Sequence, residues 1–167
     1  MRQYISVEVE GILSVYTVPH GMSDTAWQGL GFHEKNALKG AEYENQIMTN
    51  GYTAISNFLG ANGTVPGFAL YLALGNGAIN GVNIADTGLA HETQRLTSSS
   101  SILTGNVTTV TFPLAYASSN VQFTEAGLIG AGGTSTLGTG QLNTHLLFPF
   151  LQNSYTTYSL IYTLIRY

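Results

Sequence analysis

Ionised side chains are scarce in this chain. Its 167 residues include 5 Lys and Arg and 9 Asp and Glu, whereas an ordinary soluble domain is about one-quarter charged. After Glu44, the remaining charged residues are Asp86, Glu92, Arg95, Glu125 and Arg166. Because charge keeps a surface hydrated and holds molecules apart, this scarcity predicts a subunit that packs among other subunits.

Basic residues are especially few. No lysine follows Lys39, the formal net charge is −4 and the isoelectric point is near 5.4. Phosphate binding needs clustered Lys and Arg, so the composition argues against a nucleic-acid partner.

Cysteine is absent, which excludes a disulfide framework, a thiolate metal site and a cysteine nucleophile.

Long apolar runs are absent too: the longest, 67–74 and 146–151, have the length of strands, so we expect no membrane span. The first residues lack an apolar segment and reach Glu8 early, so we expect no secretory signal. A hydrophobic content of 44% and a mean hydropathy of +0.12 predict one folded domain with a hydrophobic core.

Residue patterns that would indicate catalysis are missing. No Gly-x-Ser-x-Gly motif occurs, and the few carboxylates do not form an evident glycosidase pair. The histidines lack the spacing of a zinc site, although a cluster formed by folding, or across subunits, stays open. They are His20, His33, His91 and His145. We therefore predict a protein that is not an enzyme and uses no metal and no cofactor.

The charged residues of the second half have a simpler interpretation. In a nearly neutral domain, Glu92, Arg95 and Glu125 are natural partners for one another, and partly buried charges are tolerated only when they are satisfied. We predict that these three residues form a structural ion network.

Period-2 alternation of apolar and polar residues predicts strands along most of the chain. Turn-rich Gly, Asn and Ser clusters separate these strands, which favours a mainly β fold: an antiparallel β-sandwich or barrel-like domain. Pro113 and Pro149 are expected at edges or bulges, because proline cannot donate to a ladder. The expected strands cover 68–74, 107–116, 121–129, 146–151 and 155–166.

One short helix is expected over 51–59, with Asn50 as its N-cap and Gly60 after its end. The preceding residues contain strand-like alternation at 4–10, which Gly11 interrupts and which resumes in β-rich residues at 12–18, and then a glycine-rich polar stretch. We therefore divide the chain into an extended N-terminal arm or linker, 1–48, and an antiparallel β domain, 49–167. The arm is expected to bind a partner through its apolar side chains, which are Ile5, Val7, Val9, Trp27 and Phe32.

Three consecutive segments have an order found in a known group of proteins. They are Tyr52–Gly60, the Tyr71-Leu-Ala-Leu-Gly-Asn-Gly77 strand, and Thr87–Arg95 with Glu92 three residues before Arg95. The likeness continues in Thr124-Glu-Ala-Gly-Leu128 and in a Phe148-Pro149 strand. Over roughly residues 50–165 the chain resembles a module of tailed-bacteriophage virion proteins, found in tail-collar fibre amino-terminal modules and in small capsid or neck accessory proteins.

The resemblance implies a non-catalytic component of the virion that forms a homotrimer. The favoured function is a capsid decoration or cement subunit that adheres to the major capsid protein or to other virion proteins. A tail-collar, baseplate or fibre-attachment subunit is the alternative. A carbohydrate- or receptor-binding module that uses some of the ten tyrosines is a third, since aromatic rings stack on sugars and proteins alike.

Overall fold

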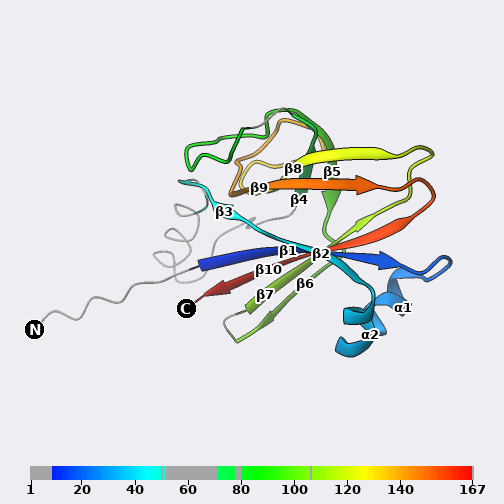
Figure 1. Ribbon diagram of the computed structural model, residues 1–167. Coiled ribbons are helices and arrows are strands. Elements are labelled where there is room, and N and C mark those ends of the chain that lie inside the picture. The colour runs from blue at the N-terminus through cyan, green and yellow to red at the C-terminus, as the bar shows by residue number, and fades with distance from the viewer. Residues whose placement is uncertain (1–8, 50, 52–70, 78–79, 106, 167) are drawn as a thin grey trace, which may run out of the picture.

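The described residues fold into two packed antiparallel sheets with two short helices. The computed structural model describes residues 9–49, 51, 71–77, 80–105 and 107–166. Sheet A has the strand order β2-β1-β10-β7-β6, and sheet B has the order β3-β9-β8-β4-β5 (Figure 1). The strands are β1 (Val9–Val18), β2 (Lys39–Glu44), β3 (Gln46–Ile47), β4 (Tyr71–Gly75), β5 (Glu92–Thr97), β6 (Ser100–Thr104), β7 (Val107–Leu114), β8 (Val121–Ile129), β9 (Thr144–Gln152) and β10 (Thr157–Arg166). The predicted mainly β, sandwich-like fold is confirmed.

Chain segments link the edges of the two sheets. β2 lies at an edge of sheet A and continues through Asn45 into β3 at an edge of sheet B. On the opposite side, β5 of sheet B continues into β6 of sheet A. In Figure 1 the cyan β2–β3 segment runs from one sheet to the other. No continuous ladder joins the sheets in the described part of the chain, so the domain is a sandwich and not a closed barrel.

The core lies between the sheets and follows the alternation read from the sequence. Alternate residues of β7 and β10, such as Phe112 and Leu160, are fully buried. In β4, Leu72, Ala73 and Leu74 are all 0% exposed, so this strand is covered on both faces. Pro149 lies beyond the pairing with β3 and beside a register shift between β8 and β9. Proline thus occupies a position where the ladder is already interrupted.

The described part of the expected arm belongs to the sandwich, and its description as an extended segment is corrected. β1 is hydrogen-bonded on both sides, to β10 and to β2. Its Leu13 and Val15 are 0% and 2% exposed and lie in the central core. A strand in the interior of a sheet, with core side chains, is a part of the domain and not an extended arm or linker.

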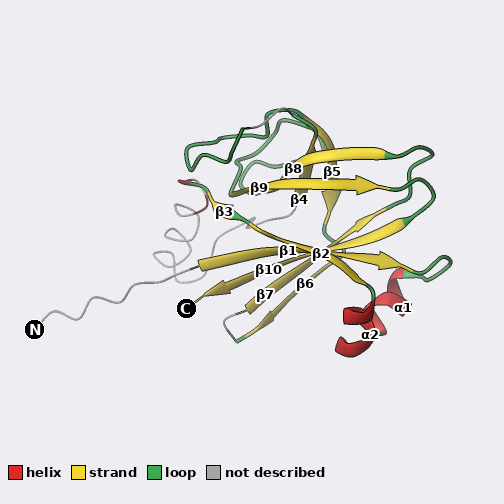
Figure 2. Ribbon diagram, viewed as in Figure 1, coloured by secondary structure: helices red, strands yellow, loops and turns green. Residues whose placement is uncertain are grey.

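Two helices follow β1 in place of the glycine-rich linker. They are α1 (Asp24–Gly29) and α2 (Phe32–Ala37), drawn in red at one end of sheet A in Figure 2. The Ser23 side chain accepts a hydrogen bond from the Ala26 N–H (3.2 Å) and caps α1. The Trp27 ring packs edge-on against Tyr16, with 5.7 Å between ring centroids. The helix that the sequence predicts over 51–59 falls almost entirely outside the described residues.

In the described part of the chain, neither helix has the length and apolar character needed to cross a membrane.

Candidate functional site

A buried carboxylate organises one end of sheet B. Glu125 lies in β8 and is 0% exposed. Its Oε1 accepts hydrogen bonds from the backbone N–H groups of Gly77 (3.2 Å) and His91 (2.8 Å), and its Oε2 accepts one from Ala90 (2.9 Å). A buried charge is costly unless hydrogen bonds compensate it. Here, the donors come from the segments after β4 and before β5, so Glu125 ties both segments to β8.

Glycine makes room for this carboxylate. A Cβ atom on Gly75 would lie 2.6 Å from Glu125 Oε1, and one on Gly77 would lie 2.7 Å from the same atom. The neighbouring Thr124 hydroxyl donates to the Gly77 carbonyl (2.7 Å). The glycines of the Leu-Gly-Asn-Gly sequence are therefore explained by the close approach of the Glu125 side chain to the backbone.

A histidine extends the network from Glu125 toward the surface. His145, in β9 and 2% exposed, places Nε2 3.1 Å from Glu125 Oε2 and Nδ1 2.8 Å from Asp86 Oδ2. Asp86 also accepts the Asn83 backbone N–H (3.0 Å). That N–H, together with the His145 ring, keeps the pKa of Asp86 below its ordinary value. Both ring nitrogens of His145 contact carboxylates, so this imidazole has no nitrogen free to act on a substrate.

A second network fixes the loop between β8 and β9. The Arg95 guanidinium contacts both oxygens of Glu92, from Nε at 2.6 Å and from Nη2 at 2.7 Å. Its Nη1 donates to the carbonyls of Thr134 (2.9 Å) and Thr139 (2.8 Å), while Glu92 Oε2 accepts the Gly138 N–H (2.7 Å). The charge pair thus serves as a clamp on residues 134–139, which we call the clamped loop.

The structure therefore separates the three charged residues that the sequence grouped together. Glu92 and Arg95 pair directly, whereas Glu125 contacts backbone N–H groups and His145. A pocket of about 340 Å³ lies between the two networks, lined among others by His91, Glu92 and Arg95. The polar atoms of Glu92 and Arg95 are already engaged by protein groups, so this arrangement holds loops in place.

No group of three or more His, Cys, Asp or Glu side chains that could hold a metal ion occurs among the described residues. The cluster formed by Asp86, His145 and Glu125 is a chain of hydrogen bonds in which the imidazole lies between two carboxylates.

Replacing Arg95 by lysine is expected to release the clamped loop. Lysine has no planar fork to match both oxygens of Glu92 and to reach the Thr134 and Thr139 carbonyls together. We expect a loss of about 2–3 kcal/mol in the free energy of unfolding, with faster hydrogen exchange at the Thr134, Thr136 and Gly138 amides.

The matched control is the exposed pair of Lys39 and Glu42, whose side chains are 29% and 49% exposed. Lys39→Gln should change stability by less than about 1 kcal/mol. Unchanged exchange in the clamped loop of the Arg95→Lys variant would show that Arg95 does not hold this loop.

The five apolar residues expected to bind a partner do not form one described surface. Ile5 and Val7 lie outside the described residues, Val9 begins β1 and Phe32 begins α2. Trp27 is 3% exposed and packs within the chain, so its ring is not available to a partner.

Sequence reasoning considered Asp86 and His145 only separately, and the structure joins them. His145 is a polar residue at the start of an otherwise apolar strand, which is a weak sign that its ring is buried and hydrogen-bonded. Its partners Asp86 and Glu125 could not be identified from the sequence, because they lie 59 and 20 residues earlier in the chain. The sequence pointed to the tyrosines only as a group, and the structure shows that two of them, Tyr116 and Tyr155, form an exposed pair.

No protein-family model, curated protein or solved structure matches this chain. The contacts described above are therefore the basis for a functional proposal.

Proposed function

We propose that this protein is a non-catalytic structural subunit of a tailed-bacteriophage virion, which decorates the capsid and stabilises the shell by adhesion. The observation that carries the proposal is an apolar stripe on a nearly uncharged surface. Leu147 and Leu151 of β9 are 49% and 46% exposed, and Pro149 between them is exposed as well. We call these three residues the β9 stripe.

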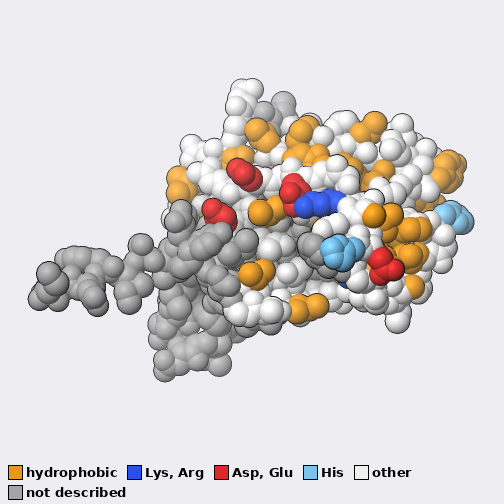
Figure 3. Space-filling model, turned by 60° about the horizontal axis from the view of Figure 1, so that its bottom comes forward, with side chains coloured by type: hydrophobic (Ala, Val, Ile, Leu, Met, Phe, Trp, Pro, Cys, Tyr) orange, Lys and Arg blue, Asp and Glu red, His pale blue; other side chains and the backbone are white. Residues whose placement is uncertain are grey.

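The position of the β9 stripe suits contact with another protein. β3 pairs with β9 only at Thr144 and His145 among the described residues, so the stripe continues past the end of that neighbour. Figure 3 shows a face of the molecule on which charged side chains are few and most of the coloured side chains are hydrophobic. Depletion of charge is typical of the core of an interface, and burial of apolar area contributes roughly 25 cal/mol per Å² before ordering costs.

The use of charge inside the domain also supports a structural role. Three of the sequence segments that resemble virion proteins meet around Glu125: the glycines at the end of β4 and just after it, the residues before Glu92, and the Thr-Glu-Ala-Gly-Leu segment of β8. Their charged side chains hold strands and loops together. A rigid domain loses little conformational entropy when it docks, which favours adhesion.

Replacing both Leu147 and Leu151 by lysine is expected to break self-association. We expect the unmodified protein to sediment as a homotrimer. In the double variant the dissociation constant should rise by about 100-fold, because two apolar contacts are lost and two charges would have to be desolvated. Sedimentation-velocity ultracentrifugation over a range of concentrations measures this change.

The control is Ile102→Lys, since Ile102 is an apolar residue of β6 with 56% exposure. This variant should remain trimeric. A monomeric unmodified protein, or dissociation by Ile102→Lys alone, would contradict a contact through the β9 stripe.

The place of the protein in the virion is tested by counting copies in purified particles of the phage that encodes it. Quantitative mass spectrometry should find hundreds of copies, together with density on the capsid in electron cryomicroscopy. A few copies at the neck or tail would favour the alternative, a tail-collar, baseplate or fibre-attachment subunit. Particles that lack the protein would refute both forms of the proposal.

A further inference from the structure

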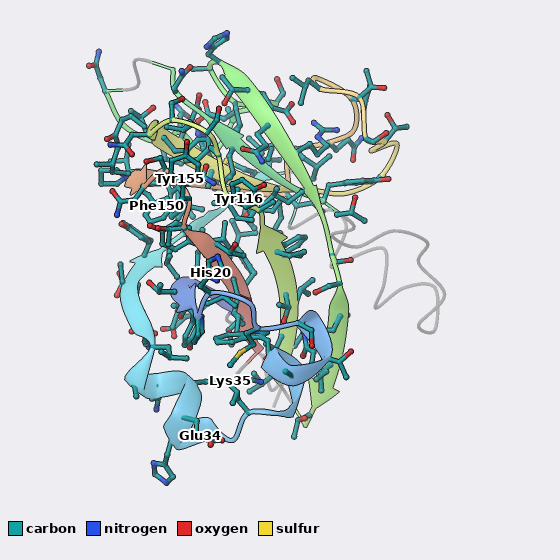
Figure 4. The ribbon with its side chains drawn as sticks, turned by 90° about the vertical axis from the view of Figure 1, so that its right-hand side faces the viewer. His20, Glu34, Lys35, Tyr116, Phe150 and Tyr155 are labelled. Atoms are coloured by element: carbon teal, nitrogen blue, oxygen red, sulfur yellow. The ribbon has the colours of Figure 1, made fainter. Side chains whose placement is uncertain are left out.

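An exposed pair of tyrosine rings marks one end of the sandwich. Tyr155 and Tyr116 are 72% and 63% exposed, the highest values among the large hydrophobic side chains that are exposed in the described part of the chain. Their ring centroids lie 6.4 Å apart and the ring planes differ by 25°. In Figure 4 both residues are labelled near Phe150. The two rings are stacked and both are largely exposed to solvent, and we call them the tyrosine pair.

The backbone at Tyr155 is held in an unusual conformation. Its φ is 58°, and it is the one residue other than glycine with a positive φ in the described chain. This left-handed region costs free energy for a residue with a side chain, and such residues concentrate at functional sites. A glycine would adopt this conformation without the cost in free energy. The presence of a tyrosine therefore suggests that its side chain has a function.

Hydrogen bonds fix the loop that carries Tyr155 to the loop that carries Tyr116. The Tyr155 N–H donates to the Ala117 carbonyl (3.0 Å), and the Ser154 N–H donates to Asn120 Oδ1 (2.7 Å). At the base, Gln152 Nε2 donates to the Ala115 carbonyl (2.6 Å). The spacing of the two rings is thus set before any ligand arrives, and preorganisation reduces the entropic cost of binding.

The polar side chains within the two loops that carry the tyrosine pair are neutral. Between Ala115 and Tyr158 the charged residue is Glu125, which is 0% exposed, and the histidine is His145, which is 2% exposed. The exposed polar residues in the two loops are Ser118, Ser119, Asn120 and Asn153. Amides and hydroxyls both donate and accept hydrogen bonds, as the hydroxyl groups of a sugar require.

From this geometry we propose that the tyrosine pair binds a neutral saccharide. The C–H face of a pyranose ring is apolar and flat enough to stack on an aromatic ring, while its equatorial hydroxyls reach neighbouring amides. Nucleic acid bases also stack on tyrosine, but single-strand binding combines stacking with a positively charged groove, and these loops contain no Lys or Arg. The tyrosine pair shares no residue with the β9 stripe, and saccharide binding does not depend on the proposed virion function.

The test measures binding of the full chain to cellohexaose, maltohexaose, chitohexaose and mannohexaose by isothermal titration calorimetry, with 3′-sialyllactose as a charged comparison. We expect saturable binding of at least one neutral hexaose, with a dissociation constant of about 1 mM or tighter. Tyr155→Gly and Tyr116→Ala should each weaken it at least tenfold, about 1.4 kcal/mol. Leu137→Ala, at a residue 45% exposed in a different loop, should leave it unchanged.

Tyr155→Gly also distinguishes binding from folding. Because glycine accepts a positive φ without strain, this variant should keep or raise the melting temperature while it loses the saccharide. Absence of binding to all four neutral sugars, preference for the sialylated sugar, or unaltered affinity in Tyr155→Gly would overturn the proposal. Dissociation of the oligomer by Tyr155→Gly would do so as well, because it would assign the tyrosine pair to a protein contact.

Discussion

Glu125→Gln is expected to lower the free energy of unfolding by about 3–5 kcal/mol, because it removes one member of a fully buried polar network. If the amide oxygen takes the place of Oε1, it still accepts from Gly77 and His91. The amide nitrogen then takes the place of Oε2 and faces the Ala90 N–H and His145 Nε2, which lie 2.9 and 3.1 Å from that oxygen. Two donors would meet at Ala90, and its N–H would be left without an acceptor.

Urea denaturation, followed by circular dichroism and tyrosine fluorescence, measures this loss. Glu44→Gln is the matched control, since Glu44 is an exposed carboxylate, and its effect should stay within about 0.5 kcal/mol. A Glu125→Gln variant within about 1 kcal/mol of the unmodified protein would mean that this carboxylate does not hold the surrounding segments together.

The sequence predicted the regular strands well because their burial is one-sided or complete. In β7 and β10, apolar and Thr or Ser residues alternate, and Phe112 and Leu160 are directly paired across the two strands. Alternation with period two is a direct consequence of the pleat. In β4, the continuous apolar run correctly predicted a strand covered on both faces.

Within residues 9–48 the sequence indicated strand character up to residue 18, where β1 lies, but it missed the helices and strands that follow because local pattern is weak there. Two six-residue helices are too short to show a clear helical period. β1 has buried polar positions such as Ser14, which donates to Glu42 (3.0 Å) and is 5% exposed. The change of sheet at Asn45 breaks the alternation between β2 and β3. Glycine and charge in this region indicated a linker, whereas tertiary contacts with β10 and Tyr16 decide the structure.

The candidate site was only partly predictable. Glu92 and Arg95 are close in sequence, yet residues three apart on a regular strand point to opposite faces. A register shift in β5, where Leu74 pairs with Gln94 but Gly75 pairs with Glu92, allows the two side chains to meet. The contact of Glu125 with His145 depends on the register between β8 and β9. No local pattern specifies that register, so this contact required the structure.

Gly77→Ala is expected to destabilise the protein by about 3 kcal/mol, because the added methyl group would occupy the space through which Glu125 reaches the backbone. The new Cβ would lie 2.6 Å from the Ala90 Cβ and 2.7 Å from Glu125 Oε1. Either the carboxylate moves away from its donors or the segment before β5 moves outward. Both changes weaken the bonds to His91 and Ala90.

Gly88→Ala is the control for this substitution, since an added Cβ at Gly88 has no atom within 4 Å. It should leave stability unchanged or raise it by up to about 1 kcal/mol, through a less flexible unfolded chain. Thermal unfolding of both variants, with amide exchange at residues 90 and 91, measures the difference. Equal effects of the two substitutions would mean that the space beside Gly77 is not required by the Glu125 carboxylate, which would contradict the prediction. A large loss of stability in Gly77→Ala alone, with faster exchange at both amides, would instead show that position 77 must lack a side chain. Only then can the Glu125 carboxylate accept hydrogen bonds from three N–H groups at this end of sheet B.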